Sequence, residues 1–154
     1  MQEFATTEQV VGQFVRKLHD MDPSAIRLRT GFKNRLDDLS AALADRLKSL
    51  DKKVSLKLRQ FRDLLDLRNM LCHGEAIVLQ QKDGAWVAHY RMTMGGKQVR
   101  HLEELIYQAD ANARLKQVHA TGQSVRDKLK AIEAKLDAKA QKSESSESST
   151  DPVK

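Results

Sequence analysis

Cysteine, proline and glycine are scarce in this 154-residue chain. The single cysteine, Cys72, excludes an internal disulfide and a cysteine-rich zinc site. Two prolines and seven glycines favour a mostly helical protein. The chain also lacks the long apolar run of a membrane span, and residues 1–14 lack the basic start and apolar block of a signal peptide. We therefore expect a soluble protein of the cytoplasm that does not contact a membrane.

Charge is abundant, and the excess of positive charge lies in one segment. The chain is 31% charged and 40% hydrophobic, which suits one domain with its own core. Its formal net charge is +6, and residues 24–59 carry ten Lys and Arg against four Asp, so 10 − 4 = +6. This segment, with Lys52 and Lys53 as candidate contacts, would attract RNA through its phosphates. A solvated helix face is the alternative explanation.

Apolar residues recur at helical spacing in the first half of the chain. Thr6 resembles an N-terminal cap and predicts a helix over about residues 6–19. Asp22, followed by proline, predicts a restart and a long amphipathic helix that ends near residue 51. A third apolar stripe predicts a helix over residues 58–74, with a glycine at its end.

The apolar period changes from 3.6 to 2 over about residues 76–100, which predicts an inserted hairpin. Asp83-Gly84 predicts a tight turn with Lys82 opposite Ala85, and Gly95-Gly96 allows a third strand. This register places an apolar set on the face toward the helices: Ile77, Leu79, Trp86, Ala88, Tyr90 and Met92, with Val99 beside Met92. The other face is largely polar.

Helical spacing resumes at Leu102 and, after a weak patch near Gly122, continues from Val118 to Leu136. A narrow stripe on a Lys-rich helix favours packing on a partner helix. Residues 141–154 are polar and predict a disordered tail. The expected organisation is thus mostly α, with one helical domain over residues 1–140, an inserted hairpin and a long C-terminal helix.

Arg68 continues the apolar stripe of the third predicted helix, and His73 ends that helix. Five residues of ideal helix rotate by about 500°, so the two side chains would lie about 140° apart. They converge if the helix ends at Cys72 or His73, or if each points toward a second subunit. Histidine can transfer a proton near neutral pH, arginine can stabilise a phosphate, and Asn69 can add a hydrogen bond, which suits RNA cleavage. On spacing alone, a capping histidine and an arginine with a buried stem are the favoured explanation of the pair.

The run Arg68-Asn69-Met70-Leu71-Cys72-His73-Gly74 resembles the signature of HEPN (higher eukaryotes and prokaryotes nucleotide-binding) domains. This resemblance implies a small helical bundle that forms a homodimer and cuts RNA without a metal or cofactor. It also implies that Arg68 and His73 are catalytic and that Asn69 is the polar position between them. The Tyr found two residues after the histidine in the toxin branch is replaced by Glu75, and the hairpin is not part of the minimal bundle.

Because the hairpin follows His73 immediately, four of its residues are further candidates for RNA contact at the border of the cleft: His89, Arg91, Lys97 and Arg100. Ordinary exposed strand residues are the alternative. His19, His101 and His119 lack metal-ligand spacing and are expected to be surface or capping residues.

Two other functions stay open. The first is a HEPN-like module that binds nucleotide or RNA, or regulates a partner, without cutting. The second is a structural protein that docks a partner through residues 118–136. A regulatory protein partner and a role as a toxin or defence protein are also compatible with the sequence.

Overall fold

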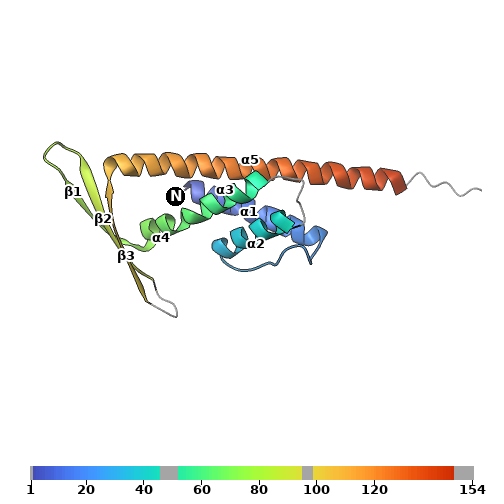
Figure 1. Ribbon diagram of the computed structural model, residues 1–154, viewed down its shortest axis with the longest axis horizontal. Coiled ribbons are helices and arrows are strands. Elements are labelled where there is room, and N and C mark those ends of the chain that lie inside the picture. The colour runs from blue at the N-terminus through green and yellow to red at the C-terminus, as the bar shows by residue number, and fades with distance from the viewer. Residues whose placement is uncertain (1, 46–51, 95–98, 148–154) are drawn as a thin grey trace, which may run out of the picture.

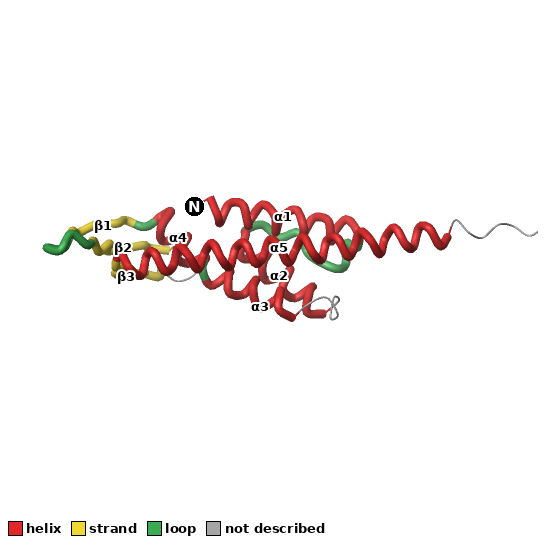
Figure 2. The backbone as a smooth tube through the Cα atoms, turned by 90° about the horizontal axis from the view of Figure 1, so that it is seen from above, coloured by secondary structure: helices red, strands yellow, loops and turns green. Residues whose placement is uncertain are grey.

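The computed structural model describes residues 2–45, 52–94 and 99–147 (Figure 1). The elements are α1 (Gln2–Met21), α2 (Phe32–Asp45), α3 (Lys52–Asp63), α4 (Leu65–His73), β1 (Glu75–Gln80), β2 (Trp86–Met94), β3 (Arg100–Tyr107) and α5 (Gln108–Glu147). The prediction of a mostly helical protein with a small antiparallel sheet and a long C-terminal helix is confirmed. Figure 2 shows the sheet at one end of the helical body. Within the described ranges no helix is both long and apolar enough to cross a membrane.

The main core lies between α1, α2, α3 and α5. α5 packs along α1 and α3, and α2 packs on α3. Three aromatic rings meet there, because the ring of Phe61 lies 5.4 Å from that of Phe4 and 6.0 Å from that of Phe32. Leu58 and Phe61 are fully buried, so the apolar stripe of the third predicted helix does face the core.

Two predicted helix starts are wrong. α1 begins at Gln2, and Thr6 lies inside it, where its hydroxyl donates to the Gln2 carbonyl at 3.0 Å. Asp22 opens a turn, because its carboxylate accepts the backbone N–H of Ser24 at 2.9 Å, and α2 begins only at Phe32. Thr and Asp bond to nearby backbone groups within helices and turns as well as at caps, so the pattern alone does not distinguish them.

The predicted third helix is two helices. At Leu64 the backbone N–H bonds to the carbonyl of Phe61, three residues back, at 3.2 Å, and this separates α3 from α4. α4 ends before Gly74, as predicted. The predicted end of the second helix, near residue 51, lies outside the described residues.

The turn between β1 and β2 is longer than the predicted two-residue turn. The N–H of Gly84 donates to the Gln81 carbonyl at 3.0 Å, and the N–H of Gln81 donates to the Ala85 carbonyl at 2.7 Å. Gly84 has a φ of 86°, so residues 82–84 form a three-residue loop closed by a left-handed glycine. The extra residue shifts the register between β1 and β2 by one position from the predicted one.

This shift reverses the faces of β1, because neighbouring side chains of a strand point to opposite sides. Ile77 and Leu79, predicted on the inner face, lie on the outer face and are 53% and 56% exposed. The inner-face prediction is correct for β2, where Met92 is buried in a second, small core. Val99 precedes β3 and is exposed, and Leu102 takes its predicted place opposite Met92.

Residues 100–107 form β3, although the spacing of their apolar residues predicts a helix. A short apolar run fits both periods, and antiparallel pairing with β2 decides between them here. β3 completes a three-stranded sheet in the order β1-β2-β3.

α5 is unbroken, and its stripe packs inside its own chain, so the predicted docking of that stripe on a partner helix is wrong. Val118, Val125, Leu129 and Ile132 are buried in the main core. Gly122 is part of this packing, because a Cβ there would lie 2.6 Å from the Glu3 Oε1 atom of α1. The helix continues past residue 141, where we expected a disordered tail to begin. Residues 148–154 lie outside the described part.

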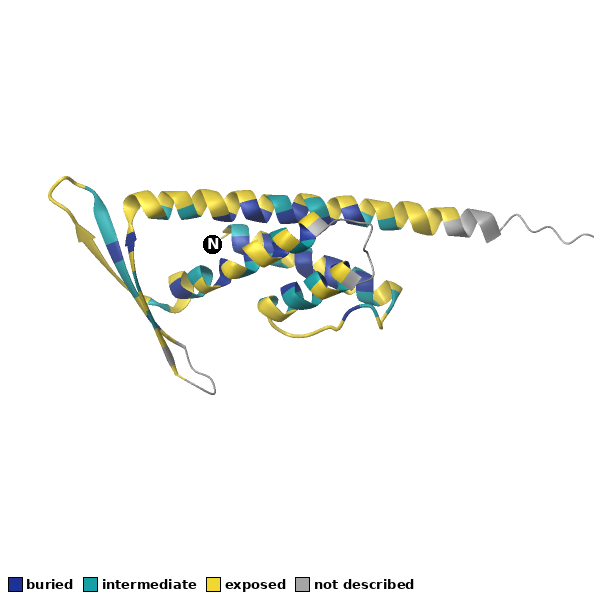
Figure 3. Ribbon diagram, in the orientation of Figure 1, coloured by how far each residue is buried: buried dark blue, intermediate teal, exposed yellow. Residues whose placement is uncertain are grey.

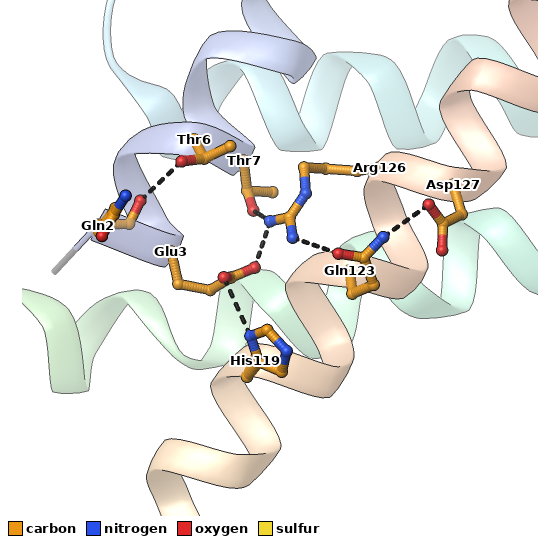
Figure 4. Close-up of polar contacts among 8 residues, drawn as sticks. All are labelled: Gln2, Glu3, Thr6, Thr7, His119, Gln123, Arg126 and Asp127. Carbon is orange, nitrogen blue, oxygen red and sulfur yellow. Dashed lines mark hydrogen bonds and ion pairs between the residues drawn. The ribbon is translucent and has the colours of Figure 1, made fainter.

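A polar cluster at the edge of this core joins α1 to α5 (Figure 4). Arg126, only 8% exposed, donates to the carboxylate of Glu3 and, at 2.8 Å, to the hydroxyl of Thr7. It also donates to Gln123 at 2.7 Å, and His119 lies 3.2 Å from Glu3. Burial raises the pKa of Glu3, but the hydrogen bonds with Arg126 and His119 outweigh it and hold this pKa below its ordinary value.

Candidate functional site

Arg68, Asn69 and His73 all belong to α4, but one chain does not bring all three side chains together. The helix is unbroken from Leu65 to His73, so the Arg68 and His73 side chains leave it about 140° apart. Arg68 is half-buried, and its Nη1 donates to the Asn69 Oδ1 at 3.0 Å. His73 is exposed at the last helical position. Asn69 therefore contacts the arginine, and the helix end does not make Arg68 and His73 converge.

Gly74 connects α4 to the sheet at a point that has no room for a side chain. Its N–H donates to the Met70 carbonyl at 2.8 Å. A Cβ on Gly74 would lie 2.4 Å from that carbonyl oxygen and 3.0 Å from the Arg91 carbonyl oxygen of β2. Its φ of −81° is open to any residue, so the close approach of two backbone segments explains the glycine. His73 is consequently held at the start of the sheet.

His73 lines an open polar hollow of about 640 Å³ where α4 meets the sheet. The other lining residues come from the three strands: Glu75, Arg91, Met92, Thr93, His101, Leu102 and Glu103. Arg68 and Asn69 are not among them. The hollow therefore combines two imidazoles, one guanidinium, one hydroxyl and two carboxylates.

Glu103 of the hollow contacts two basic side chains of β2, those of Arg91 and His89. The Arg91 Nε lies 3.4 Å from the Glu103 Oε1, and both side chains are more than 60% exposed, at 61% and 62%. The His89 Nε2 lies 2.5 Å from the same oxygen and is less exposed, at 20%. An exposed ion pair of this length is weak, so Arg91 can exchange the carboxylate for another anion.

Among the predicted RNA contacts with described side chains, Arg91 lines the hollow, whereas His89 and Lys53 do not. His89 lies on the same sheet face and contacts Glu103 instead. Lys53 is exposed at the start of α3, a separate helix from α4, which ends in His73. Lys97 lies outside the described residues, as do the side chains of Lys52 and Arg100.

His101 was missed as a candidate. We expected a surface or capping residue, but it lines the hollow together with His73, and its Nδ1 lies 3.1 Å from the Thr93 hydroxyl oxygen. The sequence did not reveal it because residues 100–107 resemble a helix. Once β3 is recognised as a strand, its pairing with β2 places His101 opposite Thr93.

In the ranges that the structure describes, no group of three or more His, Cys, Asp or Glu residues is arranged to hold a metal ion. Comparison of the chain with protein families, with curated proteins and with solved structures finds no match. The HEPN resemblance thus rests on the motif at residues 68–74.

Proposed function

We propose that the protein is a HEPN-like, metal-independent endoribonuclease of the cytoplasm that acts as a homodimer. The observation that carries this proposal is the position of His73. Its imidazole is exposed at the end of α4 and lines a polar hollow with Arg91. A proton-transfer group beside a phosphate-binding group is what cleavage of an RNA phosphodiester requires.

In the proposed reaction, a 2′-hydroxyl attacks the neighbouring phosphorus and the bond to the 5′ oxygen breaks. His73 takes part as general base or acid. The products are a 2′,3′-cyclic phosphate and a 5′-hydroxyl end. Arg91 holds the phosphate in the hollow, because its exposed pairing with Glu103 at 3.4 Å is readily exchanged.

The homodimer accounts for the separation of Arg68 from His73. Within one chain the two side chains leave α4 about 140° apart. In a twofold dimer, Arg68 of one copy reaches the phosphate held at His73 of the other, where it stabilises the charge of the transition state. The contact of Asn69 with the guanidinium, at 3.0 Å, fixes the direction in which Arg68 points.

Two rival functions differ in their support. A binding module that holds RNA or nucleotide without cutting would use the same hollow and the same Arg91. Docking of a partner through residues 118–136 is not supported, because the apolar residues of that stripe are buried against α1 and α3.

Cleavage of a labelled, structured RNA separates the nuclease from the binding module. We expect the wild-type protein to cut in the presence of a chelator and to leave cyclic phosphate ends. Positions that carry a 2′-deoxy substitution should stay uncut, because they lack the attacking hydroxyl. Arg68→Ala should cut more slowly. Binding of RNA without any cleavage by the wild-type protein would replace this proposal with the binding module.

A further inference from the structure

We propose that His101 is a second catalytic residue, and that His73 and His101 of one chain share the two proton transfers of RNA cleavage. This inference rests on the proposed ribonuclease function. RNA cleavage needs a base for the 2′-hydroxyl and an acid for the leaving oxygen, but His73 supplies only one imidazole to each hollow. His101 supplies a second imidazole to the same hollow.

The fold explains why the two histidines meet. His73 is the last residue of α4, and Glu75, two residues later, already pairs with Arg91 of β2. Thr93, two residues after Arg91, pairs with His101 of β3. The end of α4 and the pairing of β2 with β3 therefore bring both histidines to the lining of one hollow of about 640 Å³.

The surroundings of His101 suit proton transfer. Its side chain is exposed, and its Nδ1 lies 3.1 Å from the Thr93 hydroxyl oxygen. A hydroxyl can donate to a neutral ring nitrogen and accept from a protonated one, so this contact orients the ring in both states. The Nε2 on the opposite side of the ring is then directed away from Thr93.

The remaining histidines have different partners and do not line the hollow. The His19 Nδ1 lies 3.0 Å from the Ile26 carbonyl oxygen at the far end of α1. His89 contacts Glu103, and His119 contacts Glu3 of the helical core. Among the residues that line the hollow, His73 and His101 are therefore the two imidazoles.

The two proton transfers balance between these rings. One neutral imidazole takes the proton of the 2′-hydroxyl as the new bond from the 2′ oxygen to phosphorus forms. The other, protonated, imidazole gives its proton to the 5′ oxygen as the bond from phosphorus to that oxygen breaks. Arg91 offsets the charge on the phosphate, and Glu75 and Glu103 are the carboxylates that line the same hollow. The second copy is then required for Arg68 and not for an imidazole.

Single substitutions test this assignment. His73→Ala and His101→Ala should each lower the single-turnover rate of RNA cleavage about 10²–10⁴-fold, the usual range for loss of a general acid or base. His119→Ala, an exposed histidine of α5, is the matched control and should cut like the wild type. Thermal melting should show all three variants folded. His101→Ala that cuts like the wild type while His73→Ala is inactive would overturn the proposal and leave the ribonuclease function standing.

A sulfur-substituted RNA separates catalysis from a structural role. When the 5′ oxygen at the cut is replaced by sulfur, the leaving thiolate needs no proton. One of the two histidine variants should then regain most of its rate, which identifies the acid, and the other should stay slow. If neither variant regains activity, the division of acid and base between these rings is wrong.

Mixing the inactive variants tests whether both histidines come from one chain. His73→Ala and His101→Ala chains, mixed and allowed to exchange, should stay inactive, since no hollow then holds both rings. Recovery to about a quarter of the wild-type rate would mean that the two rings come from different copies, and it would overturn the proposal. A wild-type protein that cuts no RNA would instead remove the ribonuclease function itself.

Discussion

The helical core and the sheet bury their side chains to very different extents (Figure 3). In the core, Leu39, Leu58 and Phe61 have no exposed surface. In the sheet, β1 is exposed along its whole length, and burial is confined to a few inner-face residues of β2 and β3. The core therefore supplies most of the stability, and the sheet offers an open surface.

The polar side chains of the helical core are also held by more partners than those of the hollow at the sheet. Arg126 and Glu3 of the core are tied into a cluster with Thr7 and His119. In the hollow at the sheet, Arg91 and Glu103 form an ion pair of 3.4 Å, and both side chains are exposed. Groups held by several partners stabilise the fold, whereas groups with weak, exposed partners can bind a ligand. This difference is why we propose the RNA site at the junction of α4 and the sheet.

Removing the central ring of the core should have the largest effect on stability. Phe61 is fully buried between Phe4 and Phe32, so Phe61→Ala should lower the free energy of unfolding by about 3–5 kcal/mol. Tyr107 of the outer sheet face is 49% exposed, and Tyr107→Ala is the control, with an expected change within about 1 kcal/mol. Urea unfolding measures both. Equal losses would contradict the assignment of stability to the helical core.

A side chain at the junction should affect both stability and cleavage. Gly74→Ala places a Cβ against two backbone oxygens, at 2.4 and 3.0 Å, so the junction must shift. We expect a loss of about 1–3 kcal/mol and slower RNA cleavage, because His73 moves with α4.

Gly84→Ala is the control for strain. It lies at the hairpin tip with a φ of 86°, and no atom lies within 4 Å of the added Cβ. It should cost about 1 kcal/mol of stability and leave cleavage unchanged. If Gly74→Ala cuts RNA as fast as Gly84→Ala, the junction does not position His73.

Acid should weaken the core slightly, through Glu3. Its pKa in the folded protein lies below the ordinary value of 4.5, so its ion pair stabilises the fold above that value. This stabilisation should be lost as the pH falls through the lowered pKa. Glu3→Gln should be less stable than the wild type at neutral pH, and the two should approach each other in acid, as measured by urea midpoints. If the difference in stability between the two proteins stays constant with pH, the charge of the Glu3 carboxylate does not contribute to stability.

The helices could be predicted from the sequence because apolar stripes of period 3.6 bury one face. Leu58, Phe61 and Leu65 are buried for this reason, and Gly74 ends α4 where predicted. Helix starts were harder to predict. Thr6 resembles a cap in the sequence, but its hydroxyl bonds to the backbone inside α1 and not at the helix end.

The hollow could not be predicted, because it depends on strand register. The loop at residues 82–84 shifts β1 by one position, and β3 resembles a helix in its apolar spacing. His101 lines the same hollow as His73 only because β3 pairs with β2 and α4 ends where β1 begins. The sequence did show Arg68 and His73 as a motif. It did not show how far apart the two side chains point, because that depends on α4 being unbroken as far as His73.

The central claim is that His73, at the end of α4, cuts RNA. The most direct test is the single-turnover cleavage rate of His73→Ala against the wild type, with both proteins saturated by the same RNA and with chelator present. The account predicts equal RNA binding and a rate about 10²–10⁴-fold lower for the variant. Equal rates for the two proteins, or no cleavage by either, would contradict it.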